Sequence, residues 1–131
     1  MTVIVGFRPT AEGEAAFAAG LAEAQLRGEE LLVLNSPRGG ALVSADVASD
    51  ELVAGLQDRA RALDVKLEVR QSAHAGDVAD EVLRVAEEAH ASLIVIGLRR
   101  RSPVGKLILG SSAQRILLDA DRPVLAVKPG G

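Results

Sequence analysis

The segment LIVIGLRRRSPVGKLILGSS, residues 93–112, decides the fold of this chain. It begins with a continuous apolar run at 93–97, which is typical of a strand buried on both faces of a parallel sheet. It ends in Gly110, Ser111 and Ser112, after which apolar residues recur at helical spacing. Three consecutive arginines and a lysine lie between the two ends. A buried strand that leads through a charged turn into a helix predicts an α/β protein.

The same alternation of strand and helix runs through the whole chain. Short segments rich in Val, Ile and Leu are predicted to be strands at 3–7, 31–35, 65–69, 93–97 and 124–127. Helices are expected at about 12–27, 50–63, 78–89 and 111–120. Because such helices cover both faces of a sheet, we predict a doubly wound parallel sheet in one domain that spans residues 1–131. The segment 65–69 alternates apolar and charged residues, so we expect it at a sheet edge.

The composition argues against several classes of protein. The chain has 131 residues, no cysteine and only two aromatic residues, both phenylalanine. Without cysteine there are no disulfides and no thiolate metal sites. The net charge of −3 and the scarcity of aromatic rings argue against nucleic-acid binding. We see no signal peptide and no apolar run of about 18 residues, so we expect a cytoplasmic protein without a membrane span.

The densest positive charge of this acidic chain follows the fourth predicted strand. Parallel sheets bind ligands beyond the carboxyl ends of their strands, and the turns after Phe7, Asn35 and Gly97 all lie at that edge. The helix that Gly110 and Ser111 open offers free backbone N–H groups and the positive end of its dipole. The sequence therefore predicts an anion site, most simply for a phosphate group, in the loop 97–112.

Two common nucleotide motifs are absent. A P-loop fails because Arg100 stands where its first glycine belongs, and because Leu107 replaces the required Ser or Thr. A dinucleotide-binding motif fails because Gly6 is followed by Phe7 and Arg8 rather than by a second glycine at the required spacing. Any phosphate site in this chain must therefore follow another pattern.

These features together resemble the universal stress protein family over essentially the whole chain. ATP-binding members carry G-x2-G-x9-G-[ST] after the fourth strand, and Gly97, Arg100, Gly110 and Ser111 fit that spacing with arginine at the second glycine. The resemblance implies five parallel strands in the order 3-2-1-4-5 and a ligand such as ATP or another adenine nucleotide. It also leaves 124–127 at the second edge of the sheet. An exposed apolar edge strand favours pairing with a second copy, so we expect a homodimer.

Arg8 is a second departure from the pattern of the ATP-binding members, which carry an aspartate at the end of the first strand. A guanidinium only donates hydrogen bonds, so it cannot accept one from a nucleoside. Together with Arg100, it shifts the expected preference toward phosphates. The candidate ligand residues are therefore Phe7, Arg8, Pro9, Gly97, Arg99, Arg100, Gly110, Ser111 and Ser112.

No pattern in the sequence predicts a catalytic residue or a metal site. Neither His74 nor His90 stands at metal-ligand spacing or beside a nucleophile, and Asp46 is the only carboxylate that we place near the ligand edge. We therefore expect a protein that is not an enzyme, and the involvement of a metal stays open. In a plainer interpretation, Ser111 and Ser112 only cap a helix, and the arginines form a solvated turn.

Three hypotheses follow from these observations. The first is a stress-response module that binds an adenine nucleotide or another phosphate ligand. The second is an interaction protein of the same fold whose nucleotide site has decayed, as Arg8 and Arg100 suggest. The third is an enzyme that hydrolyses a nucleotide, which no feature of the sequence favours.

Overall fold

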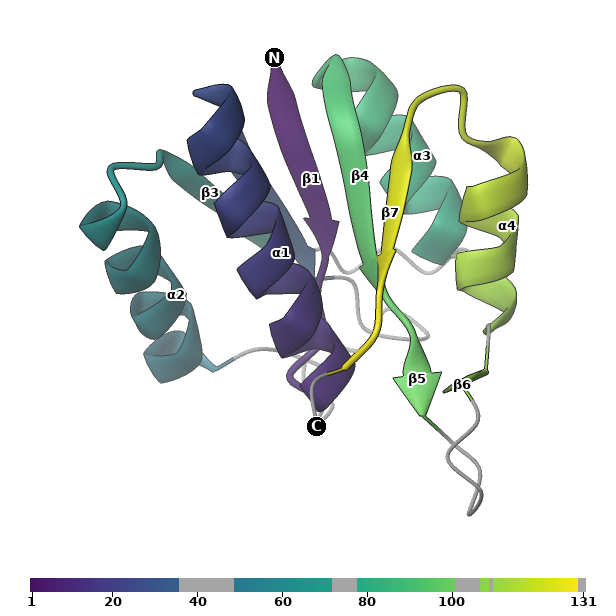
Figure 1. Ribbon diagram of the computed structural model, residues 1–131, viewed down its shortest axis with the longest axis horizontal. Coiled ribbons are helices and arrows are strands. Elements are labelled where there is room, and N and C mark those ends of the chain that lie inside the picture. Colours follow the sequence, from purple (N-terminus) through teal and green to yellow (C-terminus); the bar gives the residue numbers. More distant parts are fainter. Residues whose placement is uncertain (36–48, 72–77, 101–106, 109, 130–131) are drawn as a thin grey trace.

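A central parallel sheet lies between two pairs of helices in the computed structural model of the protein (Figure 1). The structure describes residues 1–35, 49–71, 78–100, 107–108 and 110–129. The sheet has the order β3-β2-β1-β4-β7, and each neighbouring pair is parallel. Its strands are β1 (Thr2–Gly6), β2 (Glu30–Asn35), β3 (Leu67–Gln71), β4 (Ala91–Gly97) and β7 (Val124–Val127). The helices are α1 (Ala11–Arg27), α2 (Asp50–Ala62), α3 (Val78–Glu88) and α4 (Ser111–Asp119).

The two faces of the sheet bury separate cores, because side chains along a strand alternate between its faces. Val3 and Val5 of β1 pack with α1 and α2, and Phe17 of α1 is fully buried there. Ile4 of β1 and Ile94 of β4 pack on the other face with α3 and α4. The predicted doubly wound sheet and its strand order are confirmed.

The edge position of β3 is confirmed, but the strand begins two residues later than predicted, at Leu67. The end of α2 takes up the intervening residues. Asp64 adopts a left-handed backbone with φ of 60°, and the N–H of Val65 donates to Ala60 O at 2.9 Å. This pattern is a Schellman motif, in which an apolar residue closes the helix end. Val65 is accordingly buried as part of that helix end rather than as part of the strand.

A short antiparallel ribbon lies in the segment that was expected to be a loop. It consists of β5 (Arg99–Arg100) and β6 (Leu107–Ile108), in which Arg99 pairs with Ile108 and Arg100 with Leu107. Strands of two residues are too short to leave a periodic pattern, so the sequence does not indicate them. Figure 1 shows that the ribbon extends beyond the lower ends of β4 and β7.

Within the described residues, no helix combines the length and apolar character needed to cross a bilayer.

Candidate functional site

A cavity of about 150 Å³ opens at the carboxyl edge of the sheet, where β1 and β4 end. Its walls come from the turn after β1, the first turn of α1, the first turns of α3 and the first turns of α4. In Figure 1 this edge is the lower one, and α1 and α4 begin on either side of it. The cavity therefore lies where doubly wound sheets bind their ligands.

The turn after β1 is held to β2 by a buried amide. Asn35 is fully buried, and its Nδ2 donates to Phe7 O at 2.9 Å. The backbone N–H of Phe7 donates in turn to Leu34 O at 2.9 Å. Buried polar groups paired in this way fix backbone position, because leaving one of them unpaired is costly. Asn35 thus sets the course of the chain into the cavity wall at Phe7 and Arg8.

The first turn of α1 presses closely on that wall. Thr10 is the N-cap residue, and its Oγ1 accepts a hydrogen bond from Gly13 N at 3.2 Å. A Cβ on Gly13 would lie 1.8 Å from Arg8 O, so only glycine allows this approach. Thr10, Glu12 and Gly13 all line the cavity. The sequence assigned none of them to the site, although Thr10 followed by acidic residues is an N-terminal helix signal.

The opposite wall is the N-terminus of α4. Gly110 is its N-cap residue, with extended backbone (φ −65°, ψ 163°) and no side-chain cap. The helix begins at Ser111, and the N–H of Gln114 is the first to donate along it, to Gly110 O at 2.9 Å. In the described part of the chain, the N–H groups of Ser111, Ser112 and Ala113 have no acceptor. These residues line the cavity, so the wall offers hydrogen-bond donors at the positive end of a helix dipole.

An apolar surface joins the two walls. Val78 and Val82 of α3 line the cavity together with Ile116 of α4. Arg115 forms an ion pair with Asp80 of α3 and contacts Asp119 of its own helix at 3.5 Å. The pair between Asp80 and Arg115 ties α4 to α3 next to the cavity.

Charged residues are few in the described part of the cavity, where Arg8 is the one basic residue and Glu12 is the one acidic residue. Among the described residues, no group of three or more His, Asp or Glu side chains is close enough to hold a metal ion. The pKa of Arg84, which does not line the cavity, is raised by its hydrogen bonds to Glu81 and then to Glu88.

The structure brings most of the predicted site residues together around this cavity. The predicted residues that line it are Phe7, Arg8, Gly97, Gly110, Ser111 and Ser112. Pro9 belongs to the same turn but does not line the cavity. Arg99 and Arg100 are the two residues of β5. Arg101, His74 and Asp46 lie outside the described residues.

Comparisons with known proteins agree with this architecture. The model of the universal stress protein family matches residues 1–128. A universal stress protein of Mycolicibacterium smegmatis is 42% identical over 129 residues, which are 98% of each chain. The structure of a universal stress protein from Archaeoglobus fulgidus is 30% identical, covers 98% of both chains and superposes with a TM-score of 0.80.

Two further solved structures share the fold at lower identity. One is a universal stress protein from Archaeoglobus fulgidus in complex with dAMP, which is 23% identical, covers 98% of both chains and has a TM-score of 0.73. The other is a universal stress protein in complex with cAMP, which is 23% identical, has a TM-score of 0.71 and covers 99% of this chain and 98% of that one. From its first strand to its last, this chain belongs to the universal stress protein family.

Proposed function

We propose that this protein is a stress-response module that binds an adenine nucleotide, ATP or a relative of it, with its phosphates at the N-terminus of α4. The observation that carries the proposal is the set of N–H groups of Ser111, Ser112 and Ala113 on the cavity wall. A helix N-terminus binds phosphate through such groups and through its dipole. The relatives solved with dAMP and with cAMP support an adenine nucleotide as the ligand.

The rest of the cavity suits the other parts of a nucleotide. Arg8 supplies positive charge, and a guanidinium pairs well with phosphate oxygens. Val78, Val82 and Ile116 form an apolar surface against which a base can pack. Arg99 and Arg100 precede the N-terminus of α4 in the chain and are proposed as further counter-charges for the phosphates.

We propose that the module acts by binding rather than by turnover. Within the described cavity, no histidine accompanies the hydroxyls of Thr10, Ser111 and Ser112. The Thr10 hydroxyl oxygen already accepts a hydrogen bond from Gly13. Incubation with ATP, with and without Mg²⁺, is expected to release no more ADP than a blank without protein. A cytoplasmic location stays our expectation from the sequence.

A homodimer through β7 is part of the same proposal. In the described sheet β7 pairs with β4 on one side only, and Leu125 in that strand is 37% exposed. Antiparallel pairing with a second β7 satisfies the backbone groups of the open edge and covers this apolar side chain.

One backbone substitution tests the nucleotide site directly. Ser111→Pro removes a single N–H from the cavity wall, and proline is favoured at the first position of a helix. A charge-assisted hydrogen bond contributes about 1.5–3 kcal/mol, so we expect affinity for ATP to fall roughly tenfold to a hundredfold in calorimetric titration. Ser111→Ala removes only the hydroxyl and separates its contribution from that of the N–H. Asp50→Pro makes the same change at the first residue of α2 and is the matched control.

The wild-type titration decides between this proposal and its alternative. Binding of ATP by the wild type and by Asp50→Pro, with loss in Ser111→Pro, supports the site. If no nucleotide gives heat at millimolar concentration, and none is released when native protein is denatured for mass spectrometry, the proposal is wrong. The protein is then an interaction module with a decayed site. Arg8 favours this interpretation, because it lines the cavity where ATP-binding members carry an aspartate.

A further inference from the structure

We propose that Glu12 is a specificity-determining residue of the cavity, whose carboxylate accepts hydrogen bonds from the ribose hydroxyls of a ribonucleotide. The inference rests on the proposed function and deepens it, because it names the part of the ligand that the α1 side of the cavity recognises. It starts from the only carboxylate among the described cavity residues.

Packing places the backbone of Glu12 tightly at the carboxyl edge of the sheet. A Cβ built on Gly97 would lie 2.2 Å from Glu12 O and 2.9 Å from Glu12 Cβ, so the first turn of α1 rests on the end of β4. The Thr10 cap and the close contact of Gly13 with Arg8 hold the same turn from the other side. A side chain that starts from so constrained a backbone can discriminate between ligands.

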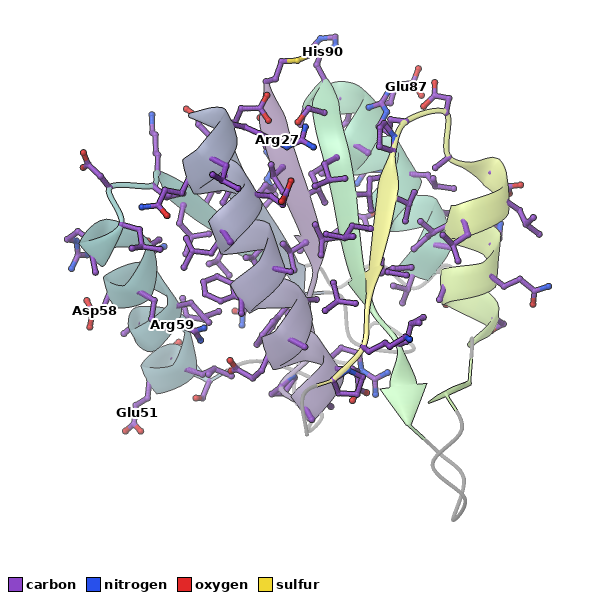
Figure 2. The ribbon with its side chains drawn as sticks, viewed as in Figure 1. Arg27, Glu51, Asp58, Arg59, Glu87 and His90 are labelled. Atoms are coloured by element: carbon purple, nitrogen blue, oxygen red, sulfur yellow. The ribbon has the colours of Figure 1, made fainter. Side chains whose placement is uncertain are left out.

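The neighbouring carboxylate on this turn has a different environment. Glu14 pairs with Arg59 of α2, which is labelled in Figure 2, with 2.9 Å between Oε2 and Nη1, and Glu14 does not line the cavity. Glu12 lines the cavity, and no described residue forms a hydrogen bond or an ion pair with its carboxylate. Both residues lie in the first turn of α1, where the helix dipole favours an acid. The dipole therefore explains an acid at either position but does not explain why one of them lines the cavity.

The chemistry of a carboxylate restricts what can lie beside it. An ionised carboxylate only accepts hydrogen bonds, so the facing part of the ligand must donate. Phosphate oxygens do not donate, and the N–H groups of α4 on the opposite wall are the better place for them.

The ribose is the nearest donor on a nucleotide whose phosphates lie at α4. It is bonded directly to the phosphate, and its two neighbouring hydroxyls match the two oxygens of one carboxylate. The same pairing of an acid with ribose hydroxyls is used in dinucleotide-binding folds. The apolar surface formed by Val82 and Ile116 is left for the base.

α1 and α4 pack on opposite faces of the sheet. A ligand held by Ser111 and by Glu12 therefore bridges the two faces across the ends of β1 and β4.

The test is a cycle that changes the protein and the ligand together. ATP and 2′,3′-dideoxyATP are titrated by calorimetry into the wild type, Glu12→Ala and Glu12→Gln. We expect Glu12→Ala to lose about tenfold in affinity for ATP and to bind dideoxyATP as the wild type does. Glu12→Gln keeps a neutral acceptor and should lie between the two. Glu14→Ala, whose side chain is outside the cavity, is the matched control and should leave both ligands unchanged. Melting temperatures verify that each variant folds.

The outcomes separate this inference from the proposed function. If the wild type binds neither ligand, the nucleotide site itself fails. If the wild type binds ATP but Glu12→Ala binds it equally well or more tightly, Glu12 does not recognise the ligand, and the inference is overturned. Inosine triphosphate, which lacks the amino group of adenine, is titrated as a third ligand. If Glu12→Ala loses equal affinity for ATP and dideoxyATP but none for inosine triphosphate, Glu12 recognises the base, and the inference is also overturned.

Discussion

Gly97 at the end of β4 lies directly against Glu12 in the first turn of α1, because a methyl group on Gly97 would meet Glu12 O at 2.2 Å. The spacing motif assigned Gly97 to the ligand. The structure gives the same residue a packing role, in which it sets how closely α1 approaches the sheet. One glycine thus couples the stability of the fold to the shape of the cavity wall.

Gly97→Ala is expected to destabilise the protein. The added methyl meets backbone rather than a movable side chain, and overpacking of this kind costs about 1–3 kcal/mol in the free energy of unfolding. Urea unfolding measures the change. Gly55→Ala is the control, because nothing lies within 4 Å of its added Cβ and Gly55 is inside α2. That variant should gain about 0.5–1 kcal/mol from helix propensity. Equal stability of the two variants contradicts the close contact at Gly97.

Asn35→Ala removes the buried donor that holds Phe7 O. The loss leaves a buried carbonyl without this partner, so we expect about 1–3 kcal/mol less stability in urea unfolding. Asn35→Asp places an acceptor against the same carbonyl and is expected to cost more at neutral pH.

The acid variant at position 35 also predicts a pH dependence. Only a protonated carboxyl can donate to Phe7 O, so the pKa of the new carboxyl is raised in the folded state above its unfolded value of about 3.9. A raised carboxyl pKa makes stability fall as pH rises. The stability gap between Asn35→Asp and the wild type should therefore narrow from pH 7 to pH 4. A gap that does not change with pH argues against the hydrogen bond.

Asp80→Asn breaks the ion pair between α3 and α4. Both side chains are about half exposed, so the cost in stability should stay below about 1 kcal/mol. Without this ion pair α4 is held less firmly against α3, and Ser111 and Ser112 belong to α4. We therefore expect affinity for ATP to fall roughly threefold. Asp119→Asn breaks an ion pair that Arg115 forms within α4, and it should leave the affinity unchanged. Equal effects of the two variants on affinity mean that the link between the helices does not position the site.

Arg8 should shift ligand preference toward the phosphate end of the nucleotide. ATP and GTP are expected to bind with similar affinity and AMP more weakly, because the cation acts on the phosphates. Arg8→Gln should reduce the affinity for ATP more than that for AMP in calorimetric titration. Arg61→Gln, on the exposed surface of α2, is the control. If Arg8→Gln lowers both affinities by the same factor, Arg8 does not read the phosphate chain.

The homodimer predicts a mass of two chains by light scattering at micromolar concentration. Leu125→Lys introduces a charge on the open strand β7 and should shift the protein toward the monomer. Leu26→Lys is the control, because Leu26 is 81% exposed and belongs to α1 rather than to the edge strand. A monomeric wild type at high micromolar concentration contradicts the dimer.

Local patterns of the sequence were sufficient to predict helices α1 to α4 and the strands of the main sheet in their order along the chain, but not β5 and β6. Continuous apolar runs at β1, β2 and β4 indicated strands buried on both faces, and the helix predicted at about 50–63 begins at Asp50 in the structure. The resemblance to the family added the strand order, which periodicity alone does not contain. The start of β3 was predicted wrongly because Val65, which continues the alternating pattern of the strand, instead closes the end of α2.

The sequence by itself determined the α/β class, the edge position of β3 and the start of α4 at Ser111 or Ser112, because each depends on residues close together in the chain. Only the tertiary structure decided that Thr10, Glu12 and Gly13 also line the cavity. The sequence around Glu12 and Gly13 is typical of the first turn of a helix. Their place in the cavity wall depends on the close contacts of Gly13 with Arg8 and of Glu12 with Gly97. The distance between α1 and β4 is set by packing across the sheet edge, and no local pattern encodes it.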